Sequence, residues 1–133
     1  MTSIFSEYIR VLKKIERHQR WAERLPPNNI VKVTDIYTID SGIITLTGYD
    51  QIRLVRIETE GAAATDNLDK IDGGVAGDII ICRAYDTTHT VLLTDNTENL
   101  RLAGDCTLDA STDTITLIYR DTVWIEIARS NND

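Results

Sequence analysis

The residue types best suited to catalysis or metal binding are rare in this sequence, which holds two cysteines and two histidines in 133 residues. His18 and His89 have no cysteine or carboxylate neighbour at the spacing of a metal site, so we expect packed or surface histidines. Cys82 and Cys106 lie among apolar residues, as Cys does when it packs as a small hydrophobe. The pattern favours two buried free thiols, since a disulfide would require the two segments to adjoin.

Carboxylates in three predicted loops are the remaining candidates for metal binding or acid–base chemistry. A calcium site needs clustered oxygen ligands and usually a glycine that turns the loop, which the DNTEN string at 95–99 lacks. Asp and Asn side chains also bond to their own backbone in turns, and this is the favoured interpretation. Calcium binding and a glycosidase-like carboxylate pair are less favoured alternatives. The sets are Asp66, Asp69 and Asp72; Asp95 and Glu98; and Asp109 and Asp113.

Motifs for nucleotide binding or nucleophilic catalysis are absent from the sequence. It contains no GxSxG, no GxGxxG and no phosphate-binding Gly-Lys-Ser/Thr loop. Gly73-Gly74 and Gly77 precede a predicted strand, so they fit a close approach of the backbone to a sheet. We therefore predict no catalytic residues, no metal ligands and no cofactor, and a protein that is not an enzyme.

The charge is divided sharply between the two parts of the chain. Residues 1–25 carry six basic and three acidic residues, a net charge of +3, whereas the other 108 residues carry eight basic and eighteen acidic residues, a net charge of −10. The acidic body argues against direct nucleic-acid binding. The basic residues either form a solvated helix face or bind an acidic partner. They are Arg10, Lys13, Lys14, Arg17, Arg20 and Arg24.

Residues 3–25 have the pattern of an amphipathic helix, which Pro26-Pro27 ends. Their apolar residues recur at intervals of three and four, a heptad seam with one polar member. Such a helix can pack on its own domain or bundle with copies of itself, and three heptads need the support of other contacts. We therefore expect residues 1–27 to form an anchoring or trimerisation segment. Its seam comprises Phe5, Tyr8, Leu12, Ile15, Gln19 and Ala22.

Residues 28–133 have the pattern of a β domain, with short runs rich in β-branched residues and turns rich in Asp, Asn, Gly and Thr. No alternation of strands and helices occurs, so we expect an antiparallel β-sandwich or jelly-roll-like domain. Residues 61–77 are expected to form the longest loop. The predicted strands are 30–39, 43–49, 51–60, 78–85, 89–94, 100–103, 106–108, 114–119 and 123–128.

Two aromatic residues of the β domain are candidates for an exposed interface or ligand site. Trp124 alternates with Val123, Ile125 and Ile127, so it faces solvent if those three face the core. An outward Trp can stack on a sugar or lie in a subunit interface, and the interface is favoured. Tyr85 ends a predicted strand next to Asp-rich loops and is the second candidate.

The stretch 77–132 resembles a C-terminal domain of tailed-bacteriophage virion proteins, including tail fibres, tail spikes and head-decorating proteins. The resemblance lies in GDII at 77–80, THTV at 88–91, NLRLAGD at 99–105, Thr107-Leu108, DTITLIY at 113–119, WIE at 124–126 and RSNN at 129–132. The chain departs from the pattern at two turns, with Asn96 and Glu98 at positions where glycines are usual and Arg120-Asp121 where Asp-Gly is usual. No ligand of those loops is therefore carried over.

The resemblance implies a homotrimer without enzymatic activity in this module. With the basic helix, it favours a capsid decoration (cement) or head-fibre protein that binds the major capsid protein or another virion protein. The alternative is a tail fibre or tail appendage module that binds a host glycan. We expect assembly in the host cytoplasm and a place on the virion, on the capsid surface rather than the tail. No membrane is expected, since the sequence has neither a signal peptide nor an apolar run of about 18 residues.

Overall fold

The computed structural model describes residues 6–10, 35–48 and 51–132. Residues 6–10 are helical, and the rest of the predicted helix lies outside the described residues. The described part of the β domain has eleven strands and one 3-10 turn, η1 (Glu60–Ala62). The strands are β1 (Ile36–Thr38), β2 (Ile43–Thr45), β3 (Ile52–Glu58), β4 (Thr65–Leu68), β5 (Lys70–Asp72), β6 (Ile79–Ala84), β7 (Thr90–Leu93), β8 (Leu100–Arg101), β9 (Cys106–Leu108), β10 (Thr114–Arg120) and β11 (Val123–Ser130).

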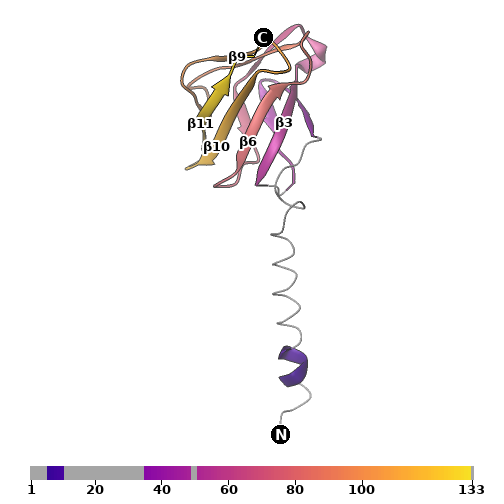
Figure 1. Ribbon diagram of the computed structural model, residues 1–133, viewed down its shortest axis with the longest axis vertical. Helices are drawn as coiled ribbons and strands as arrows, with labels where there is room; N and C mark the ends of the chain where they lie inside the picture. The colour runs from indigo at the N-terminus through magenta and orange to yellow at the C-terminus, as the bar shows by residue number, and fades with distance from the viewer. Residues whose placement is uncertain (1–5, 11–34, 49–50, 133) are drawn as a thin grey trace.

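The strands form three sheets. The main sheet has six strands in the order β1-β3-β6-β10-β11-β8, and smaller sheets are formed by β2-β5 and by β4-β7-β9. Figure 1 shows β3, β6, β10 and β11 side by side across the front of the domain, with other strands behind them. The prediction of a mainly β domain is confirmed.

Successive passes of the chain stack in parallel, as in a solenoid. Strand β6 lies beside β3 with Ile79 opposite Ile52, and β5 lies beside β2 with Lys70 opposite Ile43, an offset of 27 residues in both pairs. Among the described residues, five strand pairs are parallel and three are antiparallel. The expected antiparallel pairing is therefore wrong for most pairs. Alternating apolar residues reveal a strand but not its direction, and here strands and turns, not helices, make the crossovers.

The antiparallel strand pairs lie in the C-terminal part of the domain, and an isolated antiparallel bridge joins Asp40 and Ile43 near its start. Strands β10 and β11 form a hairpin, β10 also pairs with β6, and β9 pairs with β7. The hairpin turn is Asp121-Thr122, where φ is +51° and +72°. Two residues with positive φ are typical of a type I′ turn, which matches the twist of the strands that it joins.

The predicted loop at 61–77 is wrong, because it contains β4 and β5. Leu68 and Ile71, one on each strand, are fully buried, while most of their neighbours are polar. Such short strands have too few apolar residues to show a period of two. They form because their backbones pair in parallel with β7 and β2.

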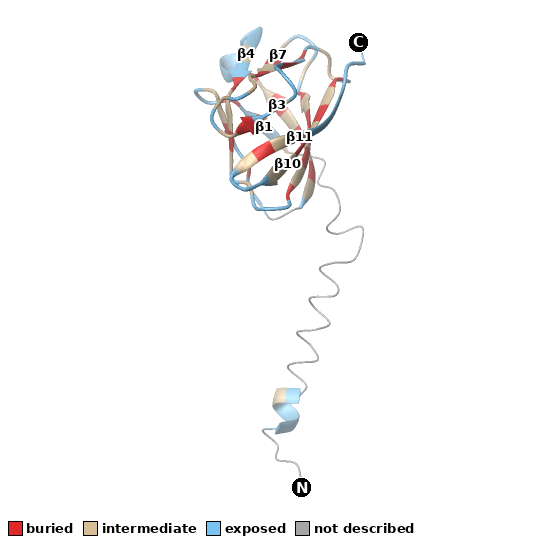
Figure 2. Cartoon of the chain, turned by 90° about the vertical axis from the view of Figure 1, so that its left-hand side faces the viewer, coloured by how far each residue is buried: buried red, intermediate tan, exposed pale blue. Residues whose placement is uncertain are grey.

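The core lies between the sheets, and in Figure 2 buried residues alternate with partly exposed ones along the strands. Trp124 is fully buried in this core, so its predicted outward position is wrong. Its indole Nε1 donates to the Ile71 carbonyl oxygen at 3.0 Å, and its ring lies 4.9 Å from that of Tyr119. Trp124 carries the largest fully buried side chain, and the gain from burying it decides which face of β11 turns inward.

Two glycines allow the backbone to pass close to this core. A Cβ on Gly73 would lie 2.4 Å from the Leu46 carbonyl oxygen, and a Cβ on Gly74 would lie 2.8 Å from ring atoms of Tyr119 and Trp124. Neither distance is possible for a real side chain. The predicted close approach of this segment to a sheet is confirmed.

Cys82 and Cys106 are buried and unbridged, as the sequence indicates. Burial raises the pKa of the Cys82 thiol far above its ordinary value, and the nearby Cys106 adds to the shift. Burial also raises the pKa of Cys106, although the Arg129 guanidinium opposes it. Both thiols are therefore protonated and unreactive at neutral pH.

Candidate interaction surface

One face of the main sheet packs against the core, and the opposite face carries apolar side chains over its central strands. Along β3 and β6 the inward residues are buried and the alternate residues are partly exposed. On β3, β6, β10 and β11, the partly exposed residues include six large aliphatic side chains, which we call the outer apolar face. They are Ile52, Leu54, Ile79, Ile81, Ile118 and Ile125.

The strand register arranges this face in rows, because residues directly opposite each other on neighbouring strands point to the same side. The first row runs Ile52, Ile79, Ile118 and Ile125 across β3, β6, β10 and β11. The second row places Leu54 beside Ile81, then Thr116 and Ala128. In the first row an apolar side chain thus faces an apolar neighbour over four adjacent strands, whereas Thr116 interrupts the second row.

A third row introduces positive charge next to the apolar rows. Arg56 of β3 lies opposite Ile36 of β1 on one side and opposite Arg83 of β6 on the other. The Arg56 guanidinium carbon lies 6.0 Å from the centre of the Tyr85 ring, the range of a cation–π contact. Tyr85 is 40% exposed, so its predicted exposure is confirmed.

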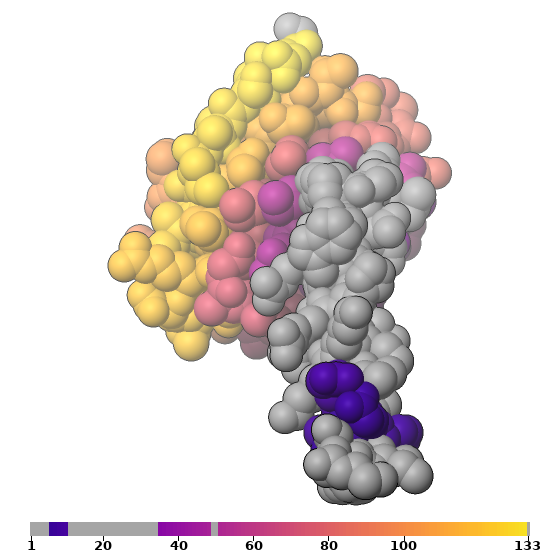
Figure 3. Space-filling model, turned by 60° about the horizontal axis from the view of Figure 1, so that its bottom comes forward, coloured from indigo at the N-terminus to yellow at the C-terminus, as the bar shows by residue number. Residues whose placement is uncertain are grey.

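The margins of the face carry two more exposed aliphatic residues. Ile36 on β1 is 46% exposed, and Ile127 on β11 is 55% exposed at a register shift between β10 and β11. The space-filling view shows the yellow C-terminal strand, the salmon central strands and the magenta N-terminal strands following one another across the domain surface (Figure 3). A surface of this kind can bury apolar side chains of a partner.

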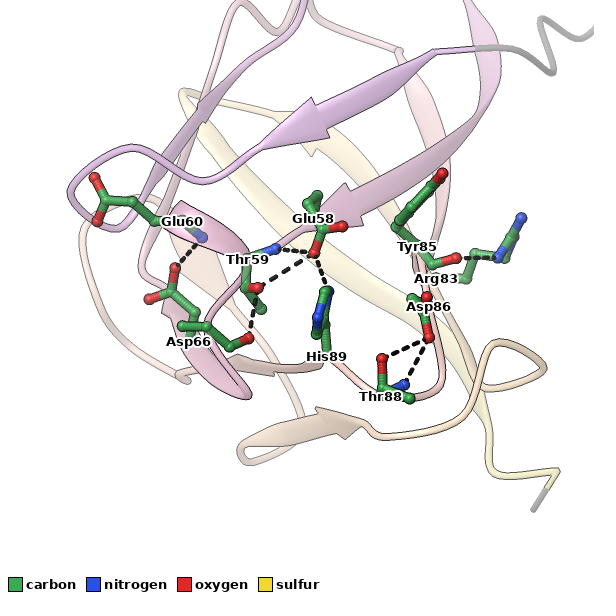
Figure 4. A network of polar contacts seen from close by, with 10 residues as sticks. Glu58, Thr59, Glu60, Asp66, Arg83, Tyr85, Asp86, Thr88 and His89 are labelled. Atoms are coloured by element: carbon green, nitrogen blue, oxygen red, sulfur yellow. Dashed lines mark hydrogen bonds and ion pairs between the residues drawn. The ribbon is translucent and has the colours of Figure 1, made fainter.

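A polar cluster ends the face near Tyr85 (Figure 4). Glu58, the last residue of β3, accepts a hydrogen bond from the Thr59 backbone N–H at 2.8 Å, and the same carboxylate oxygen lies 2.7 Å from Nδ1 of His89. The Thr59 hydroxyl donates to the Ala63 carbonyl oxygen at 2.6 Å. The same hydroxyl lies 3.2 Å from the Glu58 carboxylate oxygen that contacts His89. The cluster therefore ties β3 to the segment before β7.

The loop between β6 and β7 is closed by Asp86 within the same cluster. The Asp86 carboxylate accepts hydrogen bonds from the backbone N–H and the hydroxyl of Thr88, both at 2.8 Å, which hold the pKa of Asp86 below its ordinary value. This is the Asx turn expected of acidic loop residues. Among the described residues, no group of three or more His, Cys, Asp or Glu side chains is placed to hold a metal ion.

A second polar site lies near the C-terminus, beside a pocket of about 190 Å³ whose lining includes Cys106, Thr114 and Arg129. The Arg129 guanidinium donates to the Glu126 carboxylate and to the carbonyl oxygens of Gly104 and Asp105. The hydrogen bond from Arg129 lowers the pKa of Glu126. Because its nitrogens are occupied by these groups, Arg129 fastens the 102–105 loop to β11 instead of offering a ligand site.

Most residues predicted for the anchor lie outside the described residues, namely Phe5, Leu12, Ile15, Gln19 and Ala22 of the seam and Lys13, Lys14, Arg17, Arg20 and Arg24 of the basic face. Of the two that are described, Tyr8 is 60% exposed, and the Arg10 guanidinium forms an ion pair with Glu7 at 2.6 Å. Both therefore have side chains at the surface of the helical residues 6–10.

The comparisons with known proteins identify no relative. No family model matches the chain, and neither a curated protein nor a solved structure matches it. No helix among the described residues is long and apolar enough to cross a membrane.

The outer apolar face joins residues that sequence reasoning did not assemble into a site. The signal was present in Ile79–Ile81 and in Leu117-Ile118, where consecutive residues are apolar and so must occupy both faces of the sheet. What the sequence lacked was the order of the strands, which brings Ile52 and Ile125 into the same row.

Proposed function

We propose that this protein is a structural component of a bacteriophage virion, a homotrimeric capsid decoration or head-fibre protein that binds the capsid surface. The resemblance of residues 77–132 to virion-protein domains supports this assignment. The observation that carries it is the outer apolar face, because a domain with apolar side chains on both faces of its main sheet is built to be covered.

The division of charge supports a chain that attaches at one end. The basic N-terminal segment can meet an acidic capsid surface, while the acidic β domain is repelled from that surface and projects outward. Contacts of this type weaken as salt screens them. Binding to the capsid should therefore fall as the salt concentration rises.

Capsid binding by charge-swapped full-length chains tests the attachment. The variant Lys13→Glu/Lys14→Glu changes the basic segment, and Arg101→Glu/Arg120→Glu makes the same change of net charge on exposed residues of the β domain. We expect co-sedimentation with capsids to be lost for the first variant and kept for the second. Equal binding by both variants would refute attachment through the basic segment.

Immunogold labelling of virions with an antibody to residues 78–132 tests the place of the protein. Dense label over the head is expected. Label confined to the tail would favour the second candidate, a tail module for a host glycan, for which exposed Tyr85 beside Arg56 is the supporting observation. A glycan array that stays blank for the full-length protein would count against that candidate.

A further inference from the structure

We infer that the outer apolar face is the contact between the β domains of neighbouring copies of this chain, with the Ile52–Ile79–Ile118–Ile125 row at its centre. This inference rests on the self-association in the proposed function and says where the copies meet. It does not depend on whether the assembly is attached to head or tail.

The composition of the face is that of an interface centre. Residues 26–133 hold eighteen acidic residues, yet the first two rows contain none, and the nearest acidic residue on β3 is Glu58 at the end of the face. Depletion of charge at the centre with polar residues around it is what distinguishes an interface from ordinary surface. The exposed Ile36 and Ile127 extend the apolar surface at both margins.

Charge favours a second copy over the chain's own N-terminal helix as the occupant. Arg56 and Arg83 lie beside the apolar rows, where a helix with a net charge of +3 would bring cations against cations. The β domain of a second copy belongs to a segment with a net charge of −10, so its acidic loops can meet the same two arginines.

Dimensions point the same way. Four strands spaced about 4.8 Å apart make the face roughly 14 Å wide, and the three rows extend roughly 13 Å along the strands. A helix of 23 residues is roughly 35 Å long, so the face could cover only about half of its apolar stripe. An assembly of copies would satisfy both apolar surfaces, because the predicted helices would cover one another and the sheets would cover one another.

The size of the face also explains why it needs the helix. The three rows together cover roughly 200 Å², which is well below the roughly 800 Å² that each partner buries in a standard interface. Bundled N-terminal helices would hold the β domains at a high effective concentration, at which a small surface suffices.

Sedimentation of the full-length chain and its variants tests the inference. Ile118→Asp and Ile79→Asp place a carboxylate in the central row, whereas Val75→Asp makes the same kind of change at a residue that is 65% exposed and outside all three rows. We expect the wild type and V75D to be trimers and the two central variants to dissociate at least tenfold more readily. The milder Ile118→Thr, which keeps a β-branched residue in β10, should shift dissociation in the same direction if an aspartate prevents folding.

Two results would overturn the inference. One is a monomeric wild-type chain, and the other is a trimer of unchanged dissociation constant in folded I118D, I79D or I118T. Capsid binding is measured separately. A wild-type trimer that does not bind capsids would refute the proposed attachment but not the proposed interface between copies.

Discussion

The Asn99 side chain bonds to the backbone of β5 as a neighbouring strand would, and its removal should destabilise the domain strongly. Its Oδ1 accepts the Ile71 backbone N–H at 3.0 Å, and its Nδ2 donates to the Ile71 carbonyl oxygen at 2.7 Å. The Asn99 carbonyl oxygen in turn accepts the Trp124 backbone N–H at 2.7 Å. One residue therefore joins β5 to β11 where the next solenoid strand would otherwise lie.

The magnitude follows from what Asn99→Ala leaves behind. Two side-chain hydrogen bonds are lost, and the one to the Ile71 carbonyl oxygen is worth about 1 kcal/mol net. The Ile71 carbonyl oxygen keeps its bond from Trp124 Nε1, but the Ile71 N–H belongs to a fully buried residue and loses its side-chain acceptor. An unsatisfied buried donor costs about 1–3 kcal/mol. We expect a loss of about 2–4 kcal/mol in the free energy of unfolding.

Urea unfolding followed by tryptophan fluorescence measures this loss, since Trp124 lies in the affected core. Asn99→Asp keeps the acceptor for the Ile71 N–H but places a second acceptor against the Ile71 carbonyl oxygen, so it should also destabilise. Asn67→Ala, on an exposed position of β4, is the control and should change stability by less than about 0.5 kcal/mol. A change of that small size for N99A would refute the bridging role.

Two further predictions concern the hairpin turn and the response to acid. Thr122 is a β-branched residue at φ +72°, so Thr122→Gly should raise the free energy of unfolding by about 0.5–1 kcal/mol. Thr107→Gly, within β9, should lower the free energy of unfolding. Urea unfolding of both variants checks the two signs. Because the pKa of Glu126 is lower in the folded state, its ion pair contributes stability above the ordinary pKa of 4.5, and this stability is lost as pH falls through the folded-state pKa. Glu126→Gln should therefore reduce the loss of thermal stability between pH 6 and pH 3. Glu98→Gln, on an exposed residue, should leave that loss unchanged.

The sequence predicts most of the strands because their residues carry the signal locally. The segments 106–108 and 114–119 were predicted almost to the residue, since β-branched and apolar residues alternate there between turns. The turns at which the chain departs from the resembled virion domains are also informative. Asn96, Glu98 and Asp121 all have positive φ, a conformation that glycine adopts without cost.

The direction of pairing and the orientation of β11 could not be predicted from the sequence. Both depend on residues far apart in the chain, as when Trp124 bonds to Ile71 and Asn99 bonds to the same residue. In β11 both alternating sets contain large apolar residues, so periodicity alone does not choose between Trp124 and Ile125 as the inward side chain. Burial of the larger ring and an acceptor for its N–H make the choice.

The inward position of Trp124 has a consequence for assembly. It turns Ile125 outward, and the register with Ile118 then completes the four-strand row of isoleucines. Had β11 been reversed, that edge of the face would carry an indole and Glu126, and the apolar row would end at β10. The hydrogen bond between Trp124 and the interior of β5 therefore fixes the outer surface as well as the core. Trp124→Phe keeps an aromatic side chain but removes the hydrogen-bond donor, so any loss of self-association should be explained by its loss of folding stability. Ile118→Thr should instead weaken self-association by more than its loss of folding stability explains.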